Sequence, residues 1–208
     1  MIVRLRVGFR TRRSTRARFH SPVEGTPRTA ILMPGFEQSS SVRVFAEGSY
    51  DEVAGFRPEL LAAPAVELRR IGRLVMAGRL DLPSLEVGLV AFLRAGAPPL
   101  SPSDRDVLWS AFGLPLYEQL LGPDLEALAA ECGAHAGLHL LPGAGRLGVN
   151  VRHGILRAVP PGRTPLDFGL HARLAMDRCA CGQTTPRLTG LGAAHPAPLR
   201  AAAAVAAD

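Results

Sequence analysis

The chain has 208 residues, of which 47% are hydrophobic and 20% charged, so it can bury a core and is too apolar to be intrinsically disordered. Its formal net charge of +6 rests on arginine alone, because the sequence contains no lysine. Seven of the 24 arginines lie in residues 1–20, which hold no acid. We interpret residues 1–30 as a basic arm, which could be a frayed terminus or a site for nucleic acid or another polyanion.

We expect no targeting signal, although the Arg-rich, acid-free start can mimic a transit peptide. No apolar run is long enough to span a bilayer, and the N-terminus lacks the continuous apolar segment of a secretory signal. The three cysteines are an odd number and two of them are one residue apart, which disfavours a disulfide framework. We therefore expect a cytoplasmic protein with no membrane contact.

Residues 31–122 are predicted to form an α/β unit, and its first part holds few periodic patterns. Alternation of apolar and polar residues at 42–45 indicates one short strand. The adjacent cluster Ser39–Ser41 has no interleaved glycine. It therefore does not match a phosphate-binding loop, whose backbone must approach the phosphate closely.

A helix is predicted over residues 64–78, because Pro64 suits a first turn and Gly78 suits a C-terminal stop. Its apolar face is expected to comprise Val66, Leu68, Ile71, Leu74 and Val75. The apolar run that follows, residues 85–92, is typical of a strand buried on both faces, which favours a parallel sheet.

A second helix is predicted from Ser101, with Pro102 at its first position, Asp104 near its positive end and Gly113 as its stop. Its inward residues should be Val107, Leu108, Ala111 and Phe112. A strand is expected to start at 114–117. The order helix–strand–helix–strand predicts a parallel α/β sheet with right-handed crossovers.

Residues 123–191 are predicted to be a largely irregular, zinc-binding segment. A short helix is expected over 123–131, and prolines interrupt 138–178, with strands possible at 147–151 and 154–159. The Ala/Pro-rich tail, 192–208, has the composition of a disordered or weakly helical segment.

All three cysteines lie in this segment, and two histidines lie beside the first. Tetrahedral zinc sites commonly combine three cysteines with one histidine, and the sequence offers Cys132, Cys179 and Cys181. The fourth ligand could be His135, through a C-x2-H knuckle, or His139, across a hairpin that turns at Ala136-Gly137. No open coordination position is evident, so the zinc would be structural. Buried, reduced cysteines beside surface histidines are the alternative.

An ordered series of motifs carries a family resemblance. The runs G-A-P-P-L-S-P, A-F-G, L-P-L-Y-E, E-C-x4-G-L-H and C-x-C-G-x-T-x-P-R-L follow one another between about Phe56 and Gly190. This series resembles the phenylacetate–CoA ligase-like adenylate-forming enzymes. The resemblance implies part of the N-terminal domain of such a ligase, and it favours His139 as the fourth zinc ligand.

The same resemblance implies missing chemistry. The family uses a Gly/Ser/Thr-rich phosphate loop, a Ser/Thr-Glu pair, an acid that binds ribose and a C-terminal lysine. Here the phosphate loop is absent and Tyr117 is followed by Glu-Gln. Gly169 is kept, but Leu170 or His171 stands where the ribose acid belongs, and no lysine exists. The chain also ends before a C-terminal ligase domain could begin.

Three functional hypotheses follow. The first is a non-catalytic, zinc-stabilised protein that resembles part of a ligase. The second is half of a split acyl–CoA ligase, whose partner chain supplies the phosphate loop and lysine. The third is polyanion binding through the arginine arm. Glu118, Asp124 and Glu126 could bind magnesium in principle, but we expect them to lie on a solvated helix end.

Overall fold

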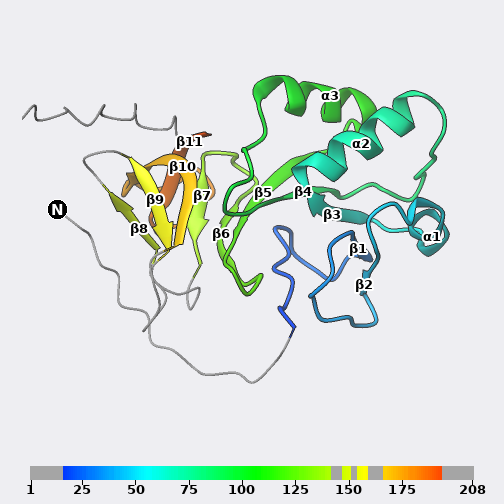
Figure 1. Cartoon of the computed structure of the whole chain (residues 1–208), viewed down its shortest axis with the longest axis horizontal. Helices are drawn as coiled ribbons and strands as arrows, with labels where there is room; N and C mark the ends of the chain where they lie inside the picture. Colours follow the sequence, from blue (N-terminus) through cyan, green and yellow to red (C-terminus); the bar gives the residue numbers. More distant parts are fainter. Residues whose placement is uncertain (1–15, 142–146, 151–153, 159–165, 194–208) are drawn as a thin grey trace, which may run out of the picture.

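The computed structural model describes residues 16–141, 147–150, 154–158 and 166–193, and its strands form one 11-stranded sheet in the order β2-β1-β3-β4-β5-β6-β7-β11-β10-β9-β8 (Figure 1). The first five are parallel: β2 (Val42–Val44), β1 (Thr29–Ile31), β3 (Leu60–Pro64), β4 (Gly88–Leu93) and β5 (Leu116–Leu121). The other six are antiparallel: β6 (Ala127–Glu131), β7 (Leu138–Leu140), β11 (Arg187–Ala193), β10 (Leu166–Ala175), β9 (Ile155–Ala158) and β8 (Leu147–Asn150). The predicted α/β class is confirmed.

Two predicted helices, α2 (Ala65–Met76) and α3 (Pro102–Phe112), cover one face of the parallel half (Figure 1). The α3 N-terminus is a capping box, in which the Ser101 hydroxyl accepts from the Asp104 backbone N–H at 3.1 Å. The Asp104 carboxylate accepts from the Ser101 N–H, also at 3.1 Å. Gly113 ends the helix in the left-handed region, with φ of 62°. Both ends of α3 therefore follow from the capping residues in the sequence.

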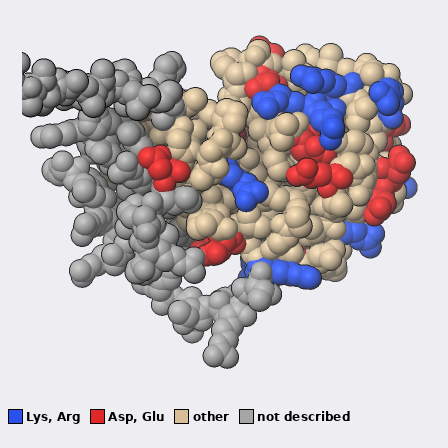
Figure 2. All heavy atoms as spheres, viewed as in Figure 1, with Lys and Arg blue, Asp and Glu red and all other residues tan. Residues whose placement is uncertain are grey.

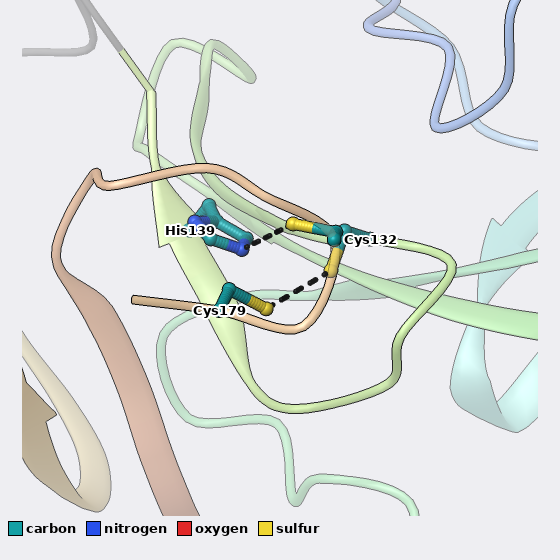
Figure 3. A group of neighbouring side chains, drawn as sticks. Cys132, His139 and Cys179 are labelled. Atoms are coloured by element: carbon teal, nitrogen blue, oxygen red, sulfur yellow. Dashed lines mark hydrogen bonds between the residues drawn. The ribbon is translucent and has the colours of Figure 1, made fainter. Parts of the chain in front are cut away.

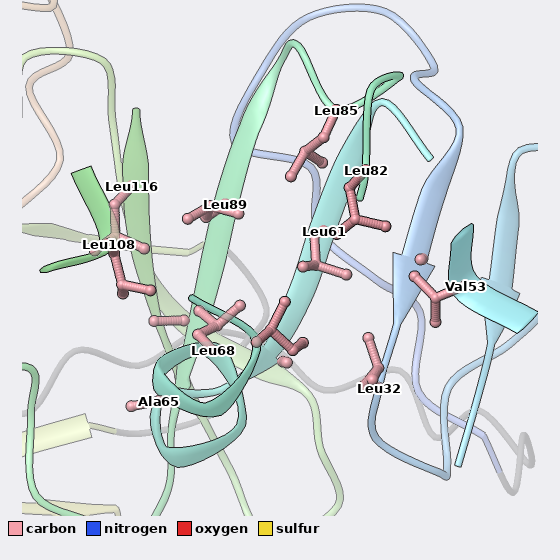
Figure 4. Close-up of a cluster of buried hydrophobic side chains, with 14 of the residues drawn as sticks. Leu32, Val53, Leu61, Ala65, Leu68, Leu82, Leu85, Leu89, Leu108 and Leu116 are labelled. Atoms are coloured by element: carbon pink, nitrogen blue, oxygen red, sulfur yellow. The ribbon is translucent and has the colours of Figure 1, made fainter. Parts of the chain in front are cut away.

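The core beneath these helices is aliphatic (Figure 4). Leu61 of β3 and Leu89 of β4 are fully buried in one cluster with Leu68 of α2 and Leu108 of α3. All six residues of β4 are buried, as predicted for a strand covered on both faces. The predictions for Val66 and Val107 were wrong, because their side chains are 65% and 37% exposed. Two helical positions turn Val66 about 200° away from Leu68, and one position turns Val107 about 100° away from Leu108.

Three elements before α2 were not predicted: β1, β3 and the short helix α1 (Tyr50–Phe56). Strand β1 has three residues, too few to show a period of two, and it is set by its pairing with β2 and β3. Helix α1 has seven residues and ends at Phe56, and the next residue, Arg57, adopts a φ of 56°. Among the described helices, none has both the length and the apolar composition to cross a membrane.

An aromatic cluster packs on the face of the parallel half that lies opposite α2 and α3. Phe36 stacks on Phe92 of β4 at a ring-centroid distance of 5.2 Å, and Phe19 meets the edge of both rings. The Ala17 N–H donates to Gly35 at 2.9 Å. The described part of the predicted arm, from residue 16, is therefore packed against the sheet, whereas residues 1–15 lie outside the described residues.

The outer edge of β2 is closed by its own loop. The Val42 N–H donates to the Ser39 hydroxyl at 3.1 Å, and the Ser39 N–H donates to the Val42 carbonyl oxygen at 2.9 Å. The Val44 N–H donates to the side-chain oxygen of Gln38 at 3.3 Å. An open strand edge attracts further strands, and these bonds occupy it. The serine cluster that begins at Ser39 thus supports the sheet edge.

The structure corrects two predictions in the segment 123–191. Residues 127–131 form strand β6 instead of a helix, because they pair with β5 on one side and β7 on the other. The described parts of 138–178 are largely strands, and the possible strands at 147–151 and 154–159 are confirmed as β8 and β9. This half also has an apolar core of its own: Leu93, Leu120, Leu128, Ala129, Leu138, Leu156, Phe168, Leu170, Ala172 and Leu188. The tail from 194 lies outside the described residues.

Candidate metal centre

The β6–β7 hairpin carries two of the predicted ligands. Cys132 directly follows β6, and His139 lies in β7 opposite Ala130. The β6–β7 loop spans residues 132–137, and its hydrogen-bonded turn lies at Gly133-Ala134. The predicted turn at Ala136-Gly137 is instead a bend just before β7, with Gly137 at a φ of 108°. A side chain at Gly137 would place its Cβ 2.5 Å from the carbonyl oxygen of Leu188. Glycine is therefore required there both by the backbone conformation and by the approach of β11.

The loop between β10 and β11 carries the other two ligands. Its backbone folds into a tight turn, in which the Cys179 N–H donates to Gln183 at 3.1 Å and the Gly182 N–H donates to Cys179 at 2.9 Å. Strand β11 then pairs with β7, which sets Arg187 opposite His139. This pairing brings the C-x-C turn beside the hairpin, although the two cysteine groups are 47 residues apart.

Four ligand atoms converge, from Cys132, His139, Cys179 and Cys181, and all lie within 4.8 Å of one another. Figure 3 shows Cys132 and Cys179 on separate segments that meet beside His139 of β7. The Cys132 and Cys179 sulfurs are 3.8 Å apart, and Cys181 Sγ is 3.4 Å from His139 Nε2. Tetrahedral zinc, with bonds of about 2.3 Å to sulfur and 2.0–2.1 Å to nitrogen, needs ligand separations of about 3.8 and 3.6 Å. The donor set fits a metal of this size and softness.

The ring of His139 is held in one orientation. Its Nδ1 lies 2.8 Å from the hydroxyl of Thr185, and the residue is 2% exposed. With the proton on Nδ1 donated to Thr185, Nε2 is left with a free electron pair towards the sulfurs. Histidines that bind metals commonly donate their other N–H to such a partner. The sequence analysis missed Thr185, although its position beside the C-x-C-G motif could have indicated it.

The alternative ligand, His135, lies outside this group. Its Nδ1 is 3.3 Å from a carboxylate oxygen of Glu131, and its ring stacks on Tyr117 at 5.3 Å. The side chain is 40% exposed. The turn geometry explains the separation, because His135 adopts a φ of 48° and its N–H donates to Cys132 at 2.9 Å.

The thiols differ in acidity. The backbone N–H of Cys181, followed by contacts with His139 and the other sulfurs, lowers the pKa of Cys179 to about 6. Burial raises the pKa of Cys132 above its ordinary value. The lowered pKa of Cys179 favours its thiolate, which is the form that binds metals.

A buried charge network, which the sequence analysis also missed, joins this hairpin to the parallel half. Glu118 of β5 and Glu131 of β6 are each 6% exposed and share the guanidinium of Arg105, at 2.5 and 3.3 Å. The Glu131 carboxylate also accepts from the Glu118 N–H at 2.9 Å. Burial raises the pKa of Glu118, and Arg105 offsets part of that effect. Because Glu131 precedes Cys132, the network anchors one ligand loop.

The expectation that Glu118, Asp124 and Glu126 share a solvated helix end is wrong. Glu118 is buried in a strand, and the other two are exposed at the β5–β6 turn. Partial desolvation, and then the negative charge of Asp124, raises the pKa of Glu126. Within the described parts of the chain, the Cys/His cluster is the one group of three or more such side chains placed to hold a metal ion.

Solved structures show what this architecture is similar to. A 2-hydroxyisobutyryl-CoA ligase, in an open conformation with 2-HIB-AMP and CoA, matches with a TM-score of 0.52 and 14% identity, over 82% of this chain and 46% of the ligase. The coronafacic acid ligase from Pectobacterium brasiliense matches with a TM-score of 0.50 and 13% identity, over 82% and 40% of the two chains. The chain has the fold of part of an adenylate-forming ligase.

The likeness concerns the fold, since the sequences are so different. No protein-family model and no curated protein matches the chain. It spans less than half the length of the ligases that it resembles. The motifs predicted a resemblance to adenylate-forming ligases, and the structural matches support that resemblance at the level of the fold.

Proposed function

We propose that this chain is a non-catalytic, zinc-stabilised protein with a phenylacetate–CoA ligase-like origin. The observation that carries the proposal is the convergence of three cysteine sulfurs and His139 Nε2 within 4.8 Å. Two hairpins, distant in sequence, supply these atoms, so an ion there would tie the loops together. The ligand motifs E-C-x4-G-L-H and C-x-C-G-x-T-x-P-R-L support the finer assignment to the phenylacetate–CoA ligase-like group.

Zinc is the metal that suits these donors best. Thiolate-rich sets with one imidazole and tetrahedral spacing are typical of structural zinc, whereas calcium and magnesium prefer oxygen ligands. Four protein ligands leave no position for a substrate or water. We keep the cytoplasm as the proposed location, because three thiolate ligands require a reducing compartment.

Metal analysis of the full chain, purified without chelator, tests the zinc site. We expect one zinc per chain in the wild type, in His135→Ala and in a surface control, and a strong loss in His139→Ala. The reason is that His139 Nε2 faces the sulfurs, whereas His135 contacts Glu131. A metal-free wild type with three freely titratable thiols would contradict the site. Loss in His135→Ala with retention in His139→Ala would show the C-x2-H geometry instead.

The proposed absence of catalysis rests on the residues at the matched positions. Adenylyl transfer depends on positioning and on charge stabilisation by magnesium and cations. Here Glu118 is paired with Arg105 inside the sheet, and the cluster at Ser39 bonds to the β2 edge. Neither Glu118 nor the serine cluster is thus available as a ligase motif, and the chain has no lysine.

We therefore expect no exchange of pyrophosphate into ATP by this chain alone with aryl or short-chain acids. Losing one charge-stabilising group typically lowers the rate by about 10²–10³, so several losses should leave no measurable rate. Radiolabelled pyrophosphate exchange measures this directly. Exchange that needs only this chain and disappears in Asp124→Ala would contradict the proposal and assign Asp124 a catalytic role.

A split acyl–CoA ligase is the second candidate, because the chain spans less than half the length of the ligases with a similar fold. A complementary chain would then supply the phosphate loop and lysine. The closed edge of β2 implies that such a chain would not extend the sheet at β2. Exchange activity that arises only when both chains are mixed would favour this candidate.

A further inference from the structure

We propose that Arg187 is a positioning residue for the metal centre: its guanidinium clamps the two ligand loops at the spacing that a metal requires. The inference rests on the proposed zinc site. Arg187 is the first residue of β11 and is 6% exposed. It donates from Nη1 to the carbonyl oxygen of Ala136 at 2.7 Å and from Nη2 to the carboxylate of Asp177 at 2.8 Å.

The two bonds reach both ligand loops. Ala136 lies in the β6–β7 loop, between Cys132 and His139, and Asp177 lies two residues before Cys179. One side chain thus bonds the hairpin that carries two ligands and the loop that carries the other two. A guanidinium suits this task because its donors are fixed in a planar fork, whereas the ammonium of lysine is a compact point charge.

The charge of Arg187 supports the same role. Arg187 is directly opposite His139 in the β7–β11 pair, so their Cβ atoms are about 4.5–5.5 Å apart. Three thiolates and a neutral imidazole around Zn²⁺ carry a net charge of −1, which a neighbouring buried cation favours. The Nε of Arg187 is buried without a hydrogen-bond partner among the described residues. The ion pair with Asp177 and the bond to Ala136 therefore compensate its burial only in part, and an anionic metal centre beside it would favour the buried charge further.

Competition for zinc against a chromophoric chelator tests the clamp in the full chain. We expect Arg187→Gln to bind zinc about 10–100-fold more weakly, as is typical when an outer partner of a metal ligand is removed. Arg187→Lys, which keeps the charge but loses the fork, should fall between Gln and wild type. The cobalt-substituted variants should keep the wild-type charge-transfer bands, because all four ligands remain. Arg178→Gln, which changes an exposed arginine of the same loop, is the matched control and should be unchanged.

A second measurement needs no metal. In chelator-treated protein, the exposed Cys181, as its thiolate, attacks oxidised glutathione and releases one glutathione. The thiolate of Cys132, whose sulfur lies within 4.8 Å of the Cys181 sulfur, then attacks the mixed disulfide and releases the second, so two protein thiols are oxidised and one glutathione disulfide is reduced. Arg187→Gln should slow this cross-link severalfold, measured by mass spectrometry, and Arg178→Gln should not.

The outcomes separate the two proposals. If the wild type binds no zinc but Arg187→Gln slows the cross-link, the zinc site fails and the clamp stands. If the wild type binds zinc, and Arg187→Gln changes neither the affinity nor the cross-linking rate, the clamp is overturned. Should Arg187→Gln fail to fold, Asp177→Ala removes only the exposed end of the clamp, since that side chain is 72% exposed. It should weaken zinc binding in the same direction, and an unchanged affinity would overturn the proposal.

Discussion

Replacing Cys179 or Cys181 with serine should lower the free energy of unfolding by several kcal/mol when zinc is present. Metal binding contributes directly to folding stability when the unfolded chain has no preformed site, and zinc-finger peptides gain about 10–16 kcal/mol in this way. The effect here should be smaller, because the antiparallel half has an aliphatic core that includes Leu138, Phe168 and Leu188. Urea denaturation of the zinc-loaded wild type and variants measures the difference.

The same denaturation in excess chelator is the control. Without metal, cysteine and serine at these positions are nearly isosteric, so we expect the variants to unfold close to the wild type. Hydrogen exchange should place the change in the β6–β7 and β10–β11 loops, which the ion joins. An equal loss of stability with and without chelator would show that the cysteines act by packing, and it would remove the case for a metal.

The parallel half from α2 onwards could be predicted well because its signals are local. Ser101, Asp104 and Gly113 mark both ends of α3 within one turn of each end, and β4 is a continuous apolar run. Strand β6 could not be predicted in this way. Its sequence A-L-A-A-E has a high helix propensity, which pairing with β5 and β7 overrides.

The candidate site was predictable in composition but not in geometry. Clustering of three cysteines beside two histidines indicated a metal, yet the sequence left His135 and His139 open as alternatives. The register of β6 against β7 decides which imidazole faces the sulfurs, and register depends on long-range pairing. Arg187 could not be recognised as a clamp for the same reason, since its partners lie 51 and 10 residues away.

Replacing Arg105 with leucine should destabilise the chain by about 3–5 kcal/mol at neutral pH, because removing one partner leaves a buried charge uncompensated. In this network two buried carboxylates depend on one guanidinium, and both Glu118 and Glu131 are 6% exposed. Arg69→Leu on α2 is the matched control. The Asp104 carboxylate is more exposed than those of Glu118 and Glu131, and it keeps its hydrogen bonds to Ser101, so we expect a loss below about 1 kcal/mol.

The pH dependence of this loss separates charge from packing. Burial raises the pKa of Glu118, so the fold favours the protonated carboxyl, and ionisation opposes folding as the pH rises. Without Arg105 that opposition grows, since the group which offsets it is gone. The difference between wild type and Arg105→Leu should therefore be largest near pH 7 and shrink as the pH falls towards the ordinary glutamate pKa of about 4.3. Urea denaturation of both proteins at several pH values, with the zinc content matched, measures the trend. A difference that stays constant with pH would mean that Arg105 stabilises the chain by the packing of its aliphatic stem, and that Glu118 and Glu131 do not depend on its charge.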